Sequence, residues 1–228
     1  VRLLYNFNMN SGHLWFMYMF VGVYFVMPII SPWLKGVSKR FEQGFLVEWF
    51  VTTFYQYVKD FIPEIYGECY WNEFGPFQYV AGYIGYVVLA HYIRMYVDWS
   101  LRKSLAVGIP MFAVGYAVTV MIFGQFAEVS DRIFDWELGW RFCTPNVVLM
   151  TAAMFLVLKK IRCRNERVVR VVADVSKLSF GIYLIHMFVL NPVYRLLSPH
   201  IESIPLTMIV VGAVTFVLSY LLIKALSY

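Results

Sequence analysis

The sequence predicts an all-α protein that crosses a membrane several times, and three observations lead to this fold class. Hydrophobic residues make up 61% of the 228 residues and charged residues only 14%, whereas about a quarter of a typical soluble domain is charged. The mean hydropathy of the chain is +0.64. Apolar runs also recur along the chain, and several are long enough to cross roughly 30 Å of hydrocarbon as helices.

Six apolar runs have about the 20 residues that a helix needs to span a bilayer. In chain order they cover residues 13–33, 77–96, 105–123, 140–158, 178–197 and 204–225. A seventh run, residues 44–58, is shorter and contains Glu48. Length alone leaves this seventh crossing undecided.

The charges between the runs decide it, because Lys and Arg are retained on the cytoplasmic side of a membrane protein. If all seven runs cross and the first runs inward, only Arg2, Lys59, Arg132, Arg141 and Arg195 of the 19 basic residues lie outside. Omitting residues 44–58 would place every later loop on the wrong side. We therefore predict seven spans in a single membrane domain over residues 1–228, with the N-terminus outside and the C-terminus cytoplasmic.

The formal net charge of +5 does not indicate a nucleic-acid partner. The basic residues are scattered over short loops, and their densest cluster, residues 159–170, adjoins the end of a predicted helix. Topology and anionic lipid headgroups account for such a distribution. We expect membrane lipids, and no nucleic acid, as partners of the basic residues.

A polar face interrupts the run over residues 178–197. Ser179, Tyr183 and His186 are spaced i, i+4 and i+7, so they share one face of a helix. An ionisable side chain at membrane depth is by default a candidate functional residue. The alternative is that His186 hydrogen-bonds a backbone carbonyl of a neighbouring helix, since polar side chains often join membrane helices.

Aromatic and acidic residues supply further candidates. His13, Trp15 and Tyr18 begin the first helix at the outer face, where they could bind a sugar or form an interfacial anchor. Tyr79, Tyr83 and Tyr86 are spaced i, i+4 and i+7, so they would lie on one face of a helix. This face could contact water and substrate, or it could pack against another helix.

Glu48 lies within a predicted span, where it could act in function or reach toward the inner interface. The four histidines and three cysteines have no metal-binding spacing, so we predict no metal site. Cys69 and Cys143 both fall outside in the predicted topology, and whether they form a disulfide stays open.

Three segments carry a family resemblance. Residues 13–18, HLWFMY, followed by Gly22, Tyr24 and Pro28, resemble the "HLWFLY…GLYLL-P" helix of the acyltransferase-3 family of integral-membrane acyltransferases. Residues 179–186 are similar to the "S-x-G-x-Y-L-x-H" penultimate helix of that family. Residues 74–83 look like a third helix motif of the family, with a weaker match.

The resemblance implies O-acyl transfer, usually of an acetyl group from cytoplasmic acetyl-CoA or another acyl-CoA, with no bound cofactor. The acceptor would be a hydroxyl of a cell-envelope polysaccharide or lipid-linked sugar on the outer side of a bacterial inner membrane. Family members have about ten spans, so this chain would be their C-terminal seven. The principal catalytic histidine is then expected upstream of Val1.

Within this chain, the resemblance leaves supporting roles to His186, Tyr183 and Ser179. Candidate substrate contacts are His13, Trp15, Tyr18, Tyr79, Tyr83 and Glu48.

Two other classes remain open. A transporter or flippase could use Pro28, Pro32 and Pro110 to break its helices, although no inverted repeat is visible. A seven-helix receptor would also fit the predicted topology, but the last run has no lysine in its interior, since Lys224 lies at its inner end. Nothing in the sequence predicts an oligomeric state.

Overall fold

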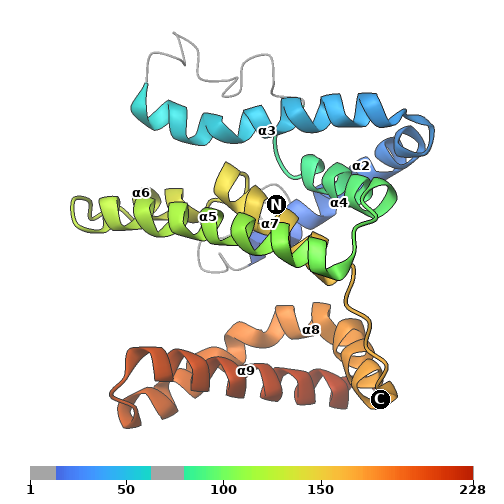
Figure 1. Ribbon diagram of the computed structural model, residues 1–228. Coiled ribbons are helices and arrows are strands. Elements are labelled where there is room, and N and C mark those ends of the chain that lie inside the picture. Colours follow the sequence, from blue (N-terminus) through green and yellow to red (C-terminus); the bar gives the residue numbers. More distant parts are fainter. Residues whose placement is uncertain (1–13, 63–79, 228) are drawn as a thin grey trace, which may run out of the picture. The chain divides into compact units, whose positions relative to one another are not determined.

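The computed structural model describes residues 14–62 and 80–227, and all regular structure in these segments is helical. The all-α fold class is thereby confirmed. The long helices shown in Figure 1 are α2 (Trp15–Gly36), α3 (Lys39–Phe61), α4 (Ile84–Tyr96), α5 (Leu101–Ala127), α7 (Pro145–Leu158), α8 (Glu166–Leu197) and α9 (Ile204–Leu226). The short helices are α6 (Ile133–Glu137), η4 (Leu138–Trp140) and η5 (Ser198–His200).

Each of the seven predicted runs overlaps one of the long helices. Four segments of the described chain are long and apolar enough to cross a membrane: Trp15–Gly36, Leu101–Ala127, Asp135–Leu158 and Ile204–Leu226. Helix α4 has only 13 residues, and α3 carries charged residues at its start and at Glu48. The other three crossings and the orientation of the chain stay predictions.

Side chains that accept hydrogen bonds from the first turn fix where several helices begin. Ser38 Oγ accepts a bond from the backbone N–H of Phe41 at the start of α3. Ser100 Oγ accepts one from Lys103 N at the start of α5, over 3.3 Å. Asn165 Oδ1 accepts a 3.0 Å bond from Arg167 N and thereby begins α8.

Helix α8 begins twelve residues before the start at residue 178 that the apolar run predicts. Residues 166–177 alternate basic side chains with valines, and Val168, Val169, Val171 and Val172 are 46–61% exposed. The mean hydropathy of such an amphipathic segment is low, because its charged residues cancel the contribution of its valines, so an apolar run does not reveal the helix. The Asn165 cap and the valine-rich face form a helix nevertheless.

Contacts divide the chain into two units, Met19–Ile161 and the combination of Val1–Tyr18 with Arg162–Tyr228. In the larger unit, α5 and α7 pack along each other through small residues. A Cβ at Gly115 would lie 2.6 Å from the Asn146 carbonyl oxygen, and one at Gly108 would lie 3.0 Å from Val157 Cγ2. The glycines therefore permit a close approach of the two backbones.

Asn146 is the centre of a buried polar network in the larger unit. Its side chain is almost inaccessible, with 2% exposure. Nδ2 donates to Thr119 Oγ1 over 2.8 Å and to the Gly139 carbonyl over 2.7 Å, while Oδ1 accepts a 2.5 Å bond from the Tyr57 hydroxyl. One side chain of α7 thus joins α3, α5 and η4, with its hydrogen-bonding capacity largely satisfied.

Trp49 joins α3 to the start of α4. Its indole is 1% exposed, donates to the Gly82 carbonyl over 2.7 Å, and lies against Gly85, where a Cβ would overlap the ring. Gly85 thus packs closely, as expected of a helix glycine. Gly82 has open space around it but a φ of +90°, so its backbone conformation requires glycine there.

In the smaller unit, α8 and α9 form a helical hairpin. Val211, Thr215 and Ser219 repeat every four residues on α9 and are 3%, 5% and 0% exposed. Gly181 of α8 lies against Ile223 of α9. This buried stripe on α9 places two hydroxyls inside the hairpin.

Candidate functional site

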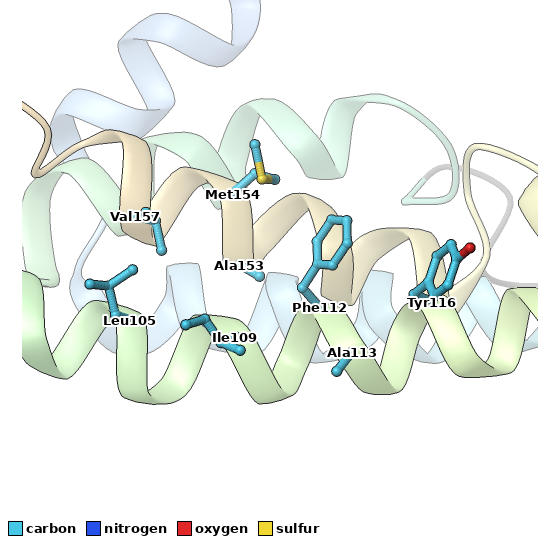
Figure 2. Close-up of a pocket in the computed structure, with 9 residues that line it drawn as sticks. Leu105, Ile109, Phe112, Ala113, Tyr116, Ala153, Met154 and Val157 are labelled. Atoms are coloured by element: carbon cyan, nitrogen blue, oxygen red, sulfur yellow. The ribbon is translucent and has the colours of Figure 1, made fainter. Parts of the chain in front are cut away.

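The described helices contain hollows of different chemical character. A groove of about 430 Å³ between α5 and α7 is lined by apolar side chains such as Leu105, Ile109 and Phe112, and Tyr116 supplies its single polar side chain (Figure 2). Such a lining offers no acid, base or charge for catalysis. The polar and charged side chains line other hollows.

An open cavity of about 430 Å³ between α8 and α9, here called the hairpin cavity, has both apolar and polar lining residues. Ser179, Tyr183 and His186 line it from α8, so the three residues share one face as their spacing predicts. Its other lining residues are Val175, Ile182 and Leu190 of α8 and Gly212, Thr215 and Phe216 of α9. The cavity therefore combines an imidazole and three hydroxyls with an apolar wall.

His186 is oriented by its own helix. Its Nδ1 hydrogen-bonds the backbone carbonyl of Tyr183, three residues earlier on α8. Because a carbonyl only accepts, the Nδ1 carries the proton, and Nε2 is then the basic nitrogen of the neutral ring. The imidazole can thus accept a proton or a hydrogen bond at one defined atom.

Tyr183 connects the cavity to the start of α2 in the smaller unit. Its ring lies 5.5 Å from the His186 ring and 5.5 Å from that of Phe16, in the latter case edge to face. Phe16 lies between the predicted candidates Trp15 and Tyr18, and its ring contacts that of Trp15 at 6.0 Å. The structure therefore brings the aromatic start of α2 to the helix that carries His186.

Thr215 is a site residue that the sequence does not single out. It is 5% exposed, and its Oγ1 is buried without a hydrogen-bond partner among the described residues. Buried hydroxyls are usually bonded, often to a carbonyl one turn earlier in the same helix. The spacing of Thr215 and Ser219 in the otherwise apolar α9 is the one sequence signal that could have found it.

A second cavity, of about 400 Å³, follows along the same helix pair. Its charged lining residues are Arg170, Asp174, Lys177 and Lys224. Lys224 Nζ lies 2.6 Å from Asp174 Oδ2 and lowers the pKa of this carboxyl, and the Tyr220 hydroxyl donates to the same oxygen over 2.5 Å. Three cations face one carboxylate, which leaves an excess of positive charge.

The comparison with protein families decides the class. A family model described as an acyltransferase domain, that of the acyltransferase-3 family, matches residues 3–224. The chain belongs to the acyltransferase-3 family. No curated protein and no solved structure gives a significant match. Membership confirms the family resemblance and favours a membrane acyltransferase over a transporter or a receptor.

Further candidate residues of this acyltransferase-3 chain belong to the larger unit or lie outside the described segments. Tyr83 begins α4 and lies 6.5 Å from Tyr86 and 6.4 Å from Phe142, ring to ring. Tyr86 donates its hydroxyl to the Phe142 carbonyl. These two tyrosines therefore pack within the larger unit. A substrate-binding role for Tyr83 stays a prediction.

Glu48 of the acyltransferase-3 chain is exposed on α3, and its functional role also stays a prediction. His13, Tyr79 and Cys69 lie outside the described residues. Cys143 is partly buried, and because Cys69 is not described, the structure does not test whether the two form a disulfide. Within residues 14–62 and 80–227, no group of three His, Cys, Asp or Glu side chains could hold a metal ion.

Proposed function

We propose that the protein moves an acetyl group from cytoplasmic acyl-CoA to a hydroxyl of a cell-envelope polysaccharide or lipid-linked sugar on the outer side of a bacterial inner membrane. Its family supplies the reaction class. The observation that supports the rest is the hairpin cavity, which His186, Tyr183 and Ser179 line together with Thr215, whose hydroxyl has no partner among the described residues. Acyl-CoA is here a substrate and not a resident cofactor.

Acyl transfer from a thioester makes and breaks defined bonds. The acceptor oxygen attacks the thioester carbonyl carbon, the C–S bond breaks, and the proton of the hydroxyl passes through a base to the departing sulfur. The site must therefore supply a base and donors for the oxyanion, and must exclude water. In a supporting role beside the principal base, Nε2 of His186 is suited to accept a hydrogen bond from the acceptor hydroxyl, and the O–H groups of Tyr183 and Thr215 are suited to donate to the carbonyl oxygen.

The adjoining basic cavity supports the choice of donor. Arg170 and Lys177 carry charges that phosphate groups attract. Asp174 in this cavity directly precedes Val175 of the hairpin cavity, so a ligand with a phosphate head could extend its acyl arm from one to the other. In the charge-based topology this end of the hairpin faces the cytoplasm, where acyl-CoA is made.

The acceptor is proposed to approach from the opposite end of the hairpin. Trp15 and Tyr18 flank Phe16, which contacts Tyr183, and an aromatic ring presents an apolar face on which a sugar can stack. His13 belongs to the same proposed acceptor surface, by its place in the sequence. Membrane lipids would surround the helices.

The full-length protein tests this function directly. Its membranes, incubated with labelled acetyl-CoA and envelope glycan, should yield base-labile acetyl esters on the glycan. His186→Ala should lower the rate by about 10²-fold, the lower range for the loss of a positioned acid or base. Phe188→Ala is the control, because Phe188 is 76% exposed on the same helix and does not line the cavity.

Two outcomes would contradict the proposal at different levels. If the wild-type protein forms no acetyl ester, the function is wrong. If wild-type protein is active and a normally expressed His186→Ala protein is equally active, then the function stands and His186 is removed from the site.

A further inference from the structure

A separate cavity of about 450 Å³ lies between α2 and α4 within the larger unit. Ser31 and Lys35 line it from α2, and His91 and Arg94 line it from α4. The remaining lining is apolar and comprises Met27, Leu34, Val87, Ala90 and Met95. None of these residues lines the hairpin cavity or the basic cavity beside it.

A buried carboxylate holds one of these side chains. Glu42 of α3 is 0% exposed, and its Oε1 lies 2.9 Å from Nδ1 of His91. Its second oxygen, Oε2, is buried without a partner among the described residues. Burying a carboxylate costs desolvation free energy, and a partner offsets only part of that cost. The Glu42–His91 pair is therefore not explained by stability alone.

The pairing determines what His91 can offer a ligand. Because the carboxylate accepts from Nδ1, that atom carries the proton, and Nε2 is left for the cavity side of the ring. Carboxylates fix the orientation of ligand-binding imidazoles in the same way at metal sites. Glu42 is therefore a positioning residue for His91.

Two cations next to His91 have no partner of their own. Neither Lys35 nor Arg94 makes an ion pair or a side-chain hydrogen bond to any residue that the structure describes. The carbonyls at the end of α4 are taken by Lys159, whose Nζ donates to those of Ile93, Arg94 and Val97 over 2.8 Å each. Lys159 thus satisfies the carbonyl groups at the end of α4, so Lys35 and Arg94 are not needed there and can bind an anion in the cavity.

We propose that this cavity binds a phosphate group, held by Lys35, Arg94 and His91 and supported by Glu42. Phosphate presents several acceptor oxygens, which suits donors that converge from two helices, and Arg pairs with it through two parallel bonds. The apolar part of the lining would accommodate a chain attached to the phosphate. The phosphate could come from an anionic lipid headgroup or from a soluble phosphate ester, and this site is independent of the proposed acyl transfer.

Binding should be measured on the full chain in nanodiscs of phosphatidylcholine. One arm adds phosphatidylglycerol and quantifies the lipid that the protein retains by native mass spectrometry. The other arm adds glycerol 3-phosphate and follows its binding by calorimetry. The test variant is Lys35→Gln with Arg94→Gln, and the matched control is Arg162→Gln with Arg164→Gln, two exposed cations before α8 that line neither cavity.

The test variant should bind at least about tenfold more weakly, as expected when charge-assisted hydrogen bonds are lost, and the control should bind like the wild type. A loss confined to phosphatidylglycerol identifies the lipid as the source, and a loss confined to glycerol 3-phosphate identifies a soluble ester. If neither ligand binds the wild type, or if both double variants lose binding equally, the proposal is overturned.

The variant Glu42→Gln tests whether the orientation of the His91 ring contributes to binding in addition to the positive charges of Lys35 and Arg94. With Lys35 and Arg94 intact, this variant should weaken binding of the same ligand and also change the ¹⁵N chemical shifts of the His91 ring, because the partner of Nδ1 changes. Unchanged ring shifts together with unchanged binding would remove Glu42 from the site.

Discussion

The pair α5–α7 and the pair α8–α9 use glycine in the same way but treat their buried polar groups differently. Gly115 and Gly181 each let two helices approach. In the first pair, Asn146 makes three hydrogen bonds, and Ser104 of α5 carries one buried hydroxyl without a partner among the described residues. In the hairpin, the hydroxyls of Thr215 and Ser219 are both buried without a partner in the part of the chain that the structure describes. The first pair satisfies its central polar side chain by its own contacts and leaves one hydroxyl unbonded, whereas the hairpin leaves two, of which that of Thr215 lines the cavity.

The largest effect should come from breaking the satisfied network. Asn146→Leu leaves the partners in Thr119 and Gly139 without their bonds, so the free energy of unfolding should fall by about 3 kcal/mol or more. Thermal unfolding of the purified protein in detergent measures this fall. Thr119→Val, which removes a single bond, is the matched control and should cost less; equal stability of Asn146→Leu and wild type would show that the network is not structural.

A smaller effect should distinguish the two glycine contacts. Gly115→Ala places a Cβ 2.6 Å from a backbone oxygen that cannot move aside, so it should cost about 1–3 kcal/mol. Gly181→Ala meets Ile223 Cγ2 at 2.9 Å, an atom of a side chain rather than of the backbone, and should therefore cost less than Gly115→Ala. The reverse order in the same unfolding measurement would show that the hairpin is the more tightly packed pair.

Thr215→Val should separate stability from activity. Replacing an unpaired buried hydroxyl by a methyl of similar shape should leave the unfolding temperature unchanged or raise it, while acetyl transfer falls because a donor in the cavity is lost. A matched change on the same buried stripe of α9, Thr207→Val, removes a hydroxyl that is bonded to the Ser203 carbonyl and should lower stability instead. A destabilised Thr215→Val protein would mean that this hydroxyl is already satisfied.

The smallest effect concerns the pH dependence of the hairpin. Lys224, followed by Tyr220, lowers the pKa of Asp174 below the usual 3.8 through hydrogen bonds. A carboxyl with a depressed pKa stabilises the folded state above its unfolded pKa and loses this contribution as the pH falls through the folded pKa. Asp174→Asn should therefore match the wild type in its pH response above pH 4 and differ from it below; a difference confined to neutral pH would contradict this assignment.

Periodic features of the sequence predict much of this fold, and contacts across helices account for the rest. The apolar runs locate the helices, and the spacing of Ser179, Tyr183 and His186 correctly places them on one face of α8. The early start of α8 depends on the Asn165 cap, which a hydropathy pattern does not detect. The pair of Glu42 with His91 joins residues 49 positions apart, and only packing of α3 on α4 brings them together.

Cysteine accessibility tests most directly whether the acyl donor occupies the hairpin cavity. In a full-length protein with its native cysteines replaced, Thr215→Cys introduces one thiol in the cavity, and Ile204→Cys introduces a control thiol at a position that is 75% exposed on the same helix. Acetyl-CoA should slow the reaction of the Thr215→Cys thiol with N-ethylmaleimide by about tenfold and leave that of the control unchanged. Equal rates for Thr215→Cys with and without acetyl-CoA would contradict the assignment of this cavity to the donor.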